Sequence, residues 1–202
     1  MPVLLLLAIV LGVVTGLLRG GSLGALGRVR VFRPWLLVAA IAALVIGRVV
    51  DGTFAAGWVA ATVLLALFAA TNTRLPGLGL VLVGVALNTA VIVANGGQMP
   101  VSMSAADRAG VSAHSVVTSP RLEPADAGTV LRPVGDVIPL AVPHVQRVIS
   151  GGDVLVAAGI GLFGALAPVR ARRTLDARRT SRAKARFRTT NRSELGPVTG
   201  DA

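Results

Sequence analysis

The chain contains no cysteine, no tyrosine and only two histidines among its 202 residues. Without cysteine it can form no disulfide, no thiolate nucleophile and no cysteine-ligated zinc or iron–sulfur centre. Aromatic residues make up 3% of the sequence and charged residues 14%, so the side chains most used in catalysis and in base stacking are scarce. We therefore predict no cofactor and no metal, and we do not expect nucleic-acid binding.

Apolar residues dominate what remains. They make up 53% of the chain, and the mean hydropathy is +0.75, above that of ordinary water-soluble domains. Twenty Lys and Arg residues oppose nine Asp and Glu residues, so the formal net charge is +11. Lys184 is the only lysine, and the permanently charged arginines suit phosphate groups. These values predict a basic integral membrane protein.

Five apolar stretches are long enough to cross a bilayer as helices. Each has 16 to 18 residues, or roughly 24–27 Å of helix. They are residues 2–18, 35–50, 54–71, 78–94 and 154–169. The first can also be a signal peptide, but no charged residue precedes Arg19, so we interpret it as a retained helix. The predicted fold is an all-α integral membrane bundle of five transmembrane helices.

The basic residues set the expected orientation. With the N-terminus outside, fifteen Lys and Arg residues fall on one side of the membrane and five on the other, and the richer side belongs in the cytoplasm. We therefore expect a protein of the plasma membrane with a cytoplasmic C-terminus. Its parts are four helices in residues 1–94, an extracytoplasmic cap segment in 95–152, the fifth helix in 153–169 and a basic tail in 170–202.

The cap segment is too polar to span and contains six prolines between residues 100 and 143. Ser104 and Asp107 have the spacing of a capping box, which predicts a short helix from there to about Val117. Residues 137–143 are apolar but short and interrupted by proline. They can dip into the bundle or lie on its outer rim.

The tail has ten basic and three acidic residues and almost nothing to bury. Its first half can be helical, but Leu175 and Phe187 are its only large apolar residues before Leu195. It therefore lacks an apolar stripe, and we favour a disordered arm. Because it begins where the fifth helix ends, we predict that it binds anionic phospholipids. The predicted contacts are Arg170, Arg172, Arg173, Arg178, Arg179, Arg182, Lys184, Arg186 and Arg188.

Small residues recur at every fourth position of three predicted helices. They are Gly12, Gly16 and Gly20, then Ala39, Ala43 and Gly47, and then Ala157, Gly161 and Ala165. Such stripes let helix backbones approach closely in lipid. They serve either the internal packing of this bundle or a seam between two copies of the chain.

Asn88 lies deep within a predicted span, and Asn95 follows seven residues later on the same helix face. A buried asparagine in lipid needs partners, so this face is expected to point into the bundle. It either ties helices together or contributes to a ligand or ion site. Asp153, with Ser150, suits the first turn of the fifth helix, which by itself accounts for that carboxyl group.

A pattern of short motifs resembles a known group of sequences. It consists of Asn72, Arg74, Leu75–Pro76–Gly77, Gly84, Asn88, the run Asn95–Gly96–Gly97–Gln98–Met99–Pro100–Val101, Gly135–Asp136–Val137–Ile138–Pro139 and Ser150–Gly151–Gly152–Asp153. It is similar to bacterial multi-pass membrane proteins of domain-of-unknown-function family 5317, over residues 1–169 and including Leu18–Arg19–Gly20–Gly21. The resemblance implies an integral membrane protein and supplies no reaction.

The run Asn95–Val101 after the fourth predicted helix contains two glycines, which permit unusual backbone angles, and one proline, which restricts the direction of the chain that follows. Glycines allow positive φ angles and proline restricts the chain direction, so the run forms either a ligand-binding corner or a plain helix end. Together with the acidic residues of the cap it defines a candidate polar site. That site comprises Asn88, Asn95, Gly96, Gly97, Met99, Pro100, Asp136 and Asp153.

The sequence supports three hypotheses for the function. The leading hypothesis is a non-enzymatic membrane component that binds a partner protein, a second copy of the chain or lipid. The alternative is a small-solute or lipid transporter that uses the face of Asn88 and Asn95. The third is a membrane enzyme that uses Asp136 or Asp153, although the sequence has no HExxH, GxSxG or metal-ligand spacing. A polar cavity joining these residues favours the last two, and a filled bundle favours the first.

Overall fold

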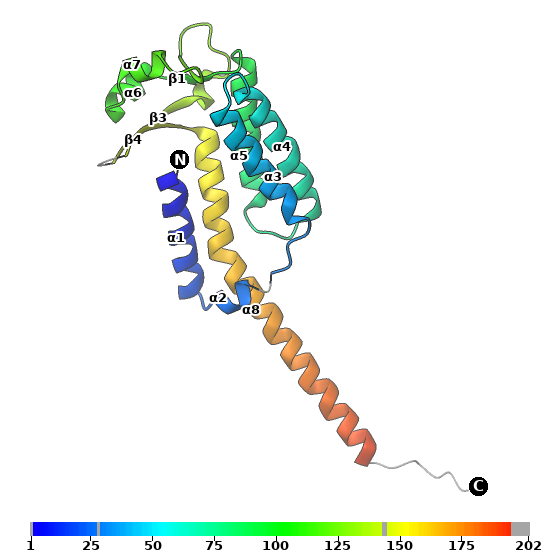
Figure 1. The fold of residues 1–202 in the computed structure, drawn as a ribbon. Helices are drawn as coiled ribbons and strands as arrows, with labels where there is room; N and C mark the ends of the chain where they lie inside the picture. The colour runs from blue at the N-terminus through cyan, green and yellow to red at the C-terminus, as the bar shows by residue number, and fades with distance from the viewer. Residues whose placement is uncertain (1, 28, 143–144, 195–202) are drawn as a thin grey trace, which may run out of the picture.

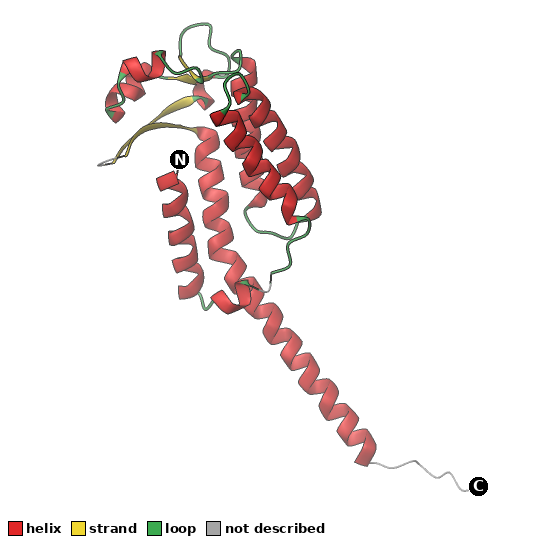
Figure 2. Ribbon diagram, in the orientation of Figure 1, coloured by secondary structure: helices red, strands yellow, loops and turns green. Residues whose placement is uncertain are grey.

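The computed structural model describes residues 2–27, 29–142 and 145–194, and it is mostly helical with a small sheet (Figures 1 and 2). Apolar helices occupy the five predicted stretches. They are α1 (Pro2–Leu18), α3 (Pro34–Val49), α4 (Phe54–Thr71), α5 (Leu78–Ala94) and the first part of α8 (Gly151–Glu194). By length and composition, α4 and residues Gly151–Arg178 of α8 can cross a membrane, whereas the other three are shorter.

The apolar helices pack in the order α1, α8, α5, α4 and α3. Backbones meet at glycines in three of these contacts. A Cβ on Gly12 would collide with the Gly161 carbonyl, one on Gly57 would lie 2.8 Å from the Gly47 Cα, and one on Gly84 would collide with the Gly152 carbonyl. Of the small residues predicted to form stripes, Gly12, Gly47 and Gly161 therefore serve internal packing.

An apolar core of modest size lies between these helices. It is built on Leu36, Ala40, Ala61, Leu65, Phe68, Val85 and Val156. The outward faces are equally apolar, as shown by Leu11 on α1 and Val38 on α3, which are 64% and 65% exposed. Large exposed apolar residues also occur on α4, α5 and α8. Contiguous apolar surface of this kind is unusual for a protein in water.

The segment between α5 and α8 forms a cap at one end of the helices (Figure 1). It contains α6 (Met103–Ala109), α7 (Ala113–Val117) and the 3-10 turn η1 (Arg132–Val134). Its four strands are β1 (Met99–Val101), β2 (Leu122–Pro124), β3 (Asp136–Val142) and β4 (Val145–Ser150), in the order β2-β1-β3-β4. Strand β1 runs parallel to β2 and β3, and β3 is antiparallel to β4. The all-α prediction was therefore wrong for the cap.

The structure refines two local predictions in the cap. Of the two alternatives for the apolar residues after Asp136, it excludes the dip into the bundle, because these residues belong to strand β3 of the cap. Strand β1 pairs with β3 only at Asp136, so at Pro139 the edge of β3 that faces away from β4 has no partner strand. Proline, which lacks an N–H group, is therefore tolerated at that position. The single predicted helix is two helices, capped first at Ser102 and interrupted at Gly110, which has φ 71°.

The tail also differs from the expected disordered arm. Helix α8 continues without a break through Glu194, so residues 170–194 form a helical extension, called the arm below, that projects beyond the bundle in Figure 1. Arginine and alanine favour helices, and no glycine or proline follows Pro168 before residue 196. Arg172 and Asp176 add an ion pair of 3.8 Å one turn apart. Residues 195–202 lie outside the described part of the chain.

The arm end of the bundle is held together by specific hydrogen bonds. Asn72, 5% exposed, pairs with the backbone of Phe32 through two hydrogen bonds of 2.9 Å, which joins the chain before α3 to the end of α4. Arg172 donates a hydrogen bond of 2.8 Å to the Gly20 carbonyl after α1. Segments 19–33, 72–77 and the arm thus share one end, and the cap occupies the other (Figure 1).

Candidate functional site

A buried polar cluster lies where α5 meets the first turn of α8, directly beneath the cap. The crossing is possible because neither Gly84 nor Gly152 has a side chain, as a Cβ on Gly152 would also collide with Oδ1 of Asn88. Asn88, Ser150 and Asp153 form the cluster and are 2%, 0% and 8% exposed. The sequence thus places three polar side chains in contact at a point of close backbone approach.

The cluster is closed by three hydrogen bonds. Nδ2 of Asn88 donates to Oδ1 of Asp153 at 2.8 Å, and the Ser150 hydroxyl donates to Oδ1 of Asn88 at 2.8 Å. The backbone N–H of Asp153 donates to the Ser150 hydroxyl at 3.0 Å, so Ser150 is the N-cap of α8, as predicted. Among the described residues, no buried side-chain nitrogen or oxygen lacks a hydrogen-bond partner. This geometry fits a structural latch between α5 and α8.

Asp136 lies at the edge of this cluster, at the start of β3. Its backbone is paired with Ser150 across the sheet, and its carbonyl accepts a hydrogen bond from Ser102 at 2.9 Å. The side chain is partly exposed, but crowding removes much of the hydration of the carboxyl group and raises its pKa to about 8. The neighbouring Asp153 raises the pKa further, and Arg147 opposes this shift. Asp136 is therefore predominantly protonated at neutral pH.

Asn95 does not join the cluster. Its side-chain amide donates to the carbonyls of Val91 and Val130, at 2.7 and 2.9 Å, and its Oδ1 accepts from the N–H of Val130 at 2.9 Å. It therefore attaches the loop after β2 to the end of α5. Asn88 and Asn95, predicted to share one helix face, thus have separate partners, and Asn95 is the C-cap of α5.

The rest of the predicted corner ends α5 and begins the sheet. Gly96 and Gly97 have φ angles of 64° and 93°, and the N–H of Gly97 donates to the Ile92 carbonyl at 2.9 Å, as in a Schellman cap. Met99 and Pro100 are buried in β1. The candidate residues thus fall into two groups, one around Asn88 and Asp153 with Asp136 beside it, and one at this corner.

A depression of about 280 Å³ lies beside the corner, between the cap and the ends of α3, α4 and α5. Its lining includes Asp51 and Gly52 from the turn before α4, Ala55 from α4, Gly96 and Gly97 from the corner, and Arg121 from the chain before β2. Sequence reasoning found the two corner glycines, gave Asp51 a structural role through its spacing from Arg48, and did not assign Arg121 to a site. Seventy positions separate Asp51 from Arg121, and no local motif connects them.

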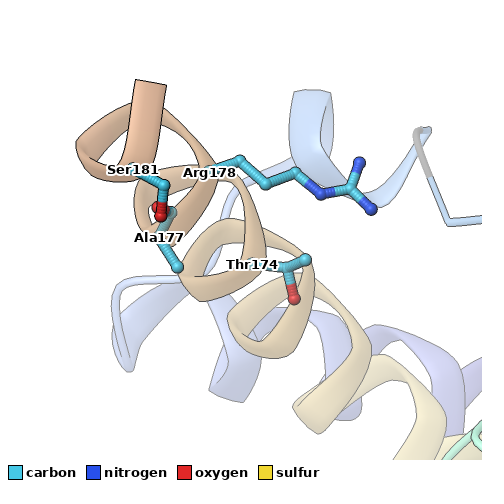
Figure 3. Close-up of a pocket in the computed structure, with 4 residues that line it drawn as sticks. All are labelled: Thr174, Ala177, Arg178 and Ser181. Atoms are coloured by element: carbon cyan, nitrogen blue, oxygen red, sulfur yellow. The ribbon is translucent and has the colours of Figure 1, made fainter. Parts of the chain in front are cut away.

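A second hollow, of about 490 Å³, follows the arm and is lined by Thr174, Ala177, Arg178 and Ser181 (Figure 3). All four come from successive turns of one helix, and Arg178 extends away from the other three. Neither hollow is lined by Asn88, Asp136 or Asp153. Of the predicted lipid contacts, Arg170, Arg172, Arg173, Arg178 and Lys184 have exposed side chains. The side chains of Arg179, Arg182, Arg186 and Arg188 lie outside the described structure.

Comparison with protein families matches residues 28–164, which is more than half of the chain. The chain belongs to a family of unknown function, DUF5317. The DUF5317 match contains α3 to α5, the whole cap and the start of α8, and therefore both groups of candidate residues. It begins later than the resemblance predicted, so α1 and Leu18–Gly21 lie outside it. No curated protein and no solved structure matches the chain.

Proposed function

We propose that this DUF5317 protein is a five-span membrane protein that acts without enzymatic chemistry, and that its helical arm binds anionic phospholipids at the cytoplasmic surface. The observation that carries the proposal is the continuity of α8. This helix is apolar where it packs in the bundle, and it carries ten basic residues after Val169. A helix with this division suits a bilayer for its first part and a polyanionic surface for its second.

The apolar exterior supports placement of the whole bundle in lipid. Exposed leucine, valine and isoleucine side chains occur on all five apolar helices, including the three shorter ones. In water, burying such surface would stabilise an aggregate by about 25 cal/mol per Å². In lipid the same side chains face acyl chains that are equally apolar, and close backbone contacts at glycines suffice for helix packing.

The distribution of charge supports the orientation. Segments 19–33, 72–77 and 170–202 contain fifteen of the twenty basic residues and only three of the nine acidic residues. The side chains of Arg19, Arg30, Arg33 and Arg74 are exposed at the arm end. The remaining six acidic residues belong to the cap end. The basic end is the one expected in the cytoplasm.

The attachment of the arm supports lipid as its ligand. Arg172 is fixed at the base of the arm by its bonds to Gly20 and Asp176. Residues 170–173 therefore lie where the apolar part of α8 ends, at the level expected for headgroups. Each basic residue near an anionic surface contributes about 1 kcal/mol, and the attraction decays within about 8–10 Å. The proximal arginines should therefore dominate binding.

Lipid retention by the full chain tests the proposal. In micelles containing phosphatidylglycerol and phosphatidylcholine, native mass spectrometry should show preferential retention of phosphatidylglycerol at low salt. Replacing Arg170, Arg173 and Arg178 by glutamine should reduce that retention several-fold. The matched cap variants Arg108→Gln, Arg132→Gln and Arg147→Gln should leave it unchanged. Equal losses from the two triple variants would contradict a lipid-binding role specific to the arm.

A further inference from the structure

The depression at the cap end contains two unlike charges that do not neutralise each other. Asp51 and Arg121 both line it, whereas the only ion pair among the described residues joins Arg172 and Asp176. One guanidinium nitrogen of Arg121 donates to the Arg48 carbonyl at 2.6 Å, in the last turn of α3. This bond orients Arg121 and uses one of its five N–H donors. The other donors remain available to a ligand in the depression.

The start of α4 adds a second group that favours an anion. Its first residues, Phe54 and Ala55, line the depression. The N-cap residue Thr53 does not cap the helix, because its hydroxyl donates instead to the Val50 carbonyl at 2.8 Å. The first N–H groups of an 18-residue helix therefore receive no side-chain cap. Uncapped N–H groups and the helix dipole both attract phosphate.

Glycines keep the depression open. Gly52 and Gly96 have φ angles of 76° and 64°, and a Cβ added to either would meet nothing within 4 Å. On the adjacent end of α3, Val45 and Val49 are exposed by 55% and 74%, and the exposed Arg48 lies between them on the same face. A ligand seated between Asp51 and Arg121 would therefore have both exposed apolar side chains and a further cation beside it. The depression combines an anion site, a cation site and neighbouring apolar side chains.

We propose that this depression binds a phosphate ester bearing a primary ammonium group, the chemistry of phosphoethanolamine. Arg121 and the start of α4 hold the phosphate, and the Asp51 carboxylate holds the ammonium. The ligand is either the headgroup of a phospholipid or a free phosphoethanolamine ester. This inference concerns the end of the molecule opposite the arm. Its free-ester form does not depend on the membrane placement proposed above.

Native mass spectrometry of the full chain in detergent tests this site because it identifies a bound ligand by mass. The probes are diacyl phosphatidylethanolamine, soluble glycerophosphoethanolamine and their ammonium-free counterparts, phosphatidylglycerol and glycerophosphate. The chain used carries Arg170→Gln, Arg173→Gln and Arg178→Gln, so that the arm retains less phosphatidylglycerol, and in it binding of an ammonium-bearing probe should exceed that of its counterpart. Retention of the lipid alone identifies a headgroup, whereas equally tight binding of the soluble ester identifies a free ligand.

Three variants assign the binding to the depression. Asp51→Asn and Arg121→Gln should each weaken binding at least tenfold. Gly96→Asn should also weaken it, because asparagine tolerates the positive φ angle and fills the open space. The controls Asp107→Asn and Arg108→Gln remove the same charges from exposed positions on α6 and should have no effect. Failure of both ammonium-bearing probes to bind, or unchanged binding in Asp51→Asn and Gly96→Asn, would overturn the proposal.

Discussion

The side-chain amide of Asn88 donates a hydrogen bond of 2.8 Å to the carboxyl group of Asp153, which is 65 positions later in the chain. This bond joins α5 to the first turn of α8 at the point where the cap returns to the bundle. Ser150 completes the contact from the last residue of β4. The cap, α5 and α8 are thus fixed to each other by one small polar latch.

Replacing Asn88 by alanine should destabilise the protein. The change leaves the Ser150 hydroxyl and the Asp153 carboxyl group without their partner at a buried position, which typically costs about 1–3 kcal/mol. Thermal unfolding in detergent should therefore show a clear loss. Thr15→Ala is the control, because this hydroxyl is exposed and bonds only within its own helix, to the Leu11 carbonyl. Equal unfolding temperatures of the two variants would contradict a stabilising role of the latch.

Two glycine-to-alanine changes should have opposite effects. In Gly152→Ala the new Cβ would lie 2.5 Å from the Gly84 carbonyl oxygen and would also collide with Asn88, so α5 and α8 must separate. A loss of about 1–3 kcal/mol follows from such overpacking. In Gly79→Ala, in the first turn of α5, the Cβ meets nothing within 4 Å, and stability should stay level or rise. Unfolding midpoints in detergent measure both.

The carboxyl group of Asp136 should make stability depend on pH. Its pKa rises in the folded protein from the ordinary value of 3.8 to about 8, so the folded state holds a proton that the unfolded state releases. The stabilisation is complete below pH 3.8 and declines as the pH rises toward 8. The charge of Asp153 raises the pKa of Asp136, and the charge of Arg147 lowers it. Asp136→Asn should make the unfolding midpoint nearly independent of pH between pH 5 and pH 8. The exposed control Asp107→Asn should retain the pH dependence of the wild type.

The proposed orientation can be tested with single cysteines, because the natural chain has none. Ser115→Cys places a thiol on α7 of the cap, and Ser181→Cys places one on the arm, both at exposed positions. A membrane-impermeant maleimide added to intact cells should label position 115 and spare position 181. Permeabilised cells should give labelling at both positions. Labelling of position 181 in intact cells would reverse the orientation.

The helices could be predicted from sequence because each depends on a local property. A stretch of sixteen or more mainly apolar residues predicts an apolar helix, and the end of α5 is marked by Gly96, Gly97 and Pro100. The pairing of Asn88 with Asp153 was only partly predictable. The sequence indicates that a buried asparagine needs partners, but the partner is fixed by a backbone crossing at Gly84 and Gly152.

The cap was beyond the same reasoning because its strands are short and far apart. Strand β1 has three residues, and its partners in β2 and β3 begin at Leu122 and Asp136. The arm was misjudged for a different reason. A missing apolar stripe predicts that a helix will not pack, whereas this helix continues from a packed segment and needs no stripe of its own. Asp51 and Arg121 come to line one depression only through the tertiary fold.

A spin label on Ser181→Cys can report whether the arm lies against an anionic membrane surface. The full chain is reconstituted into nanodiscs of phosphatidylcholine alone or with phosphatidylglycerol, and collisions of the label with oxygen and with a water-soluble nickel complex are compared. Phosphatidylglycerol should bring the label toward the lipid, and 1 M salt, where screening acts over about 3 Å, should reverse this shift. If the label is equally exposed to water in both lipids at low salt, the arm does not bind the anionic surface.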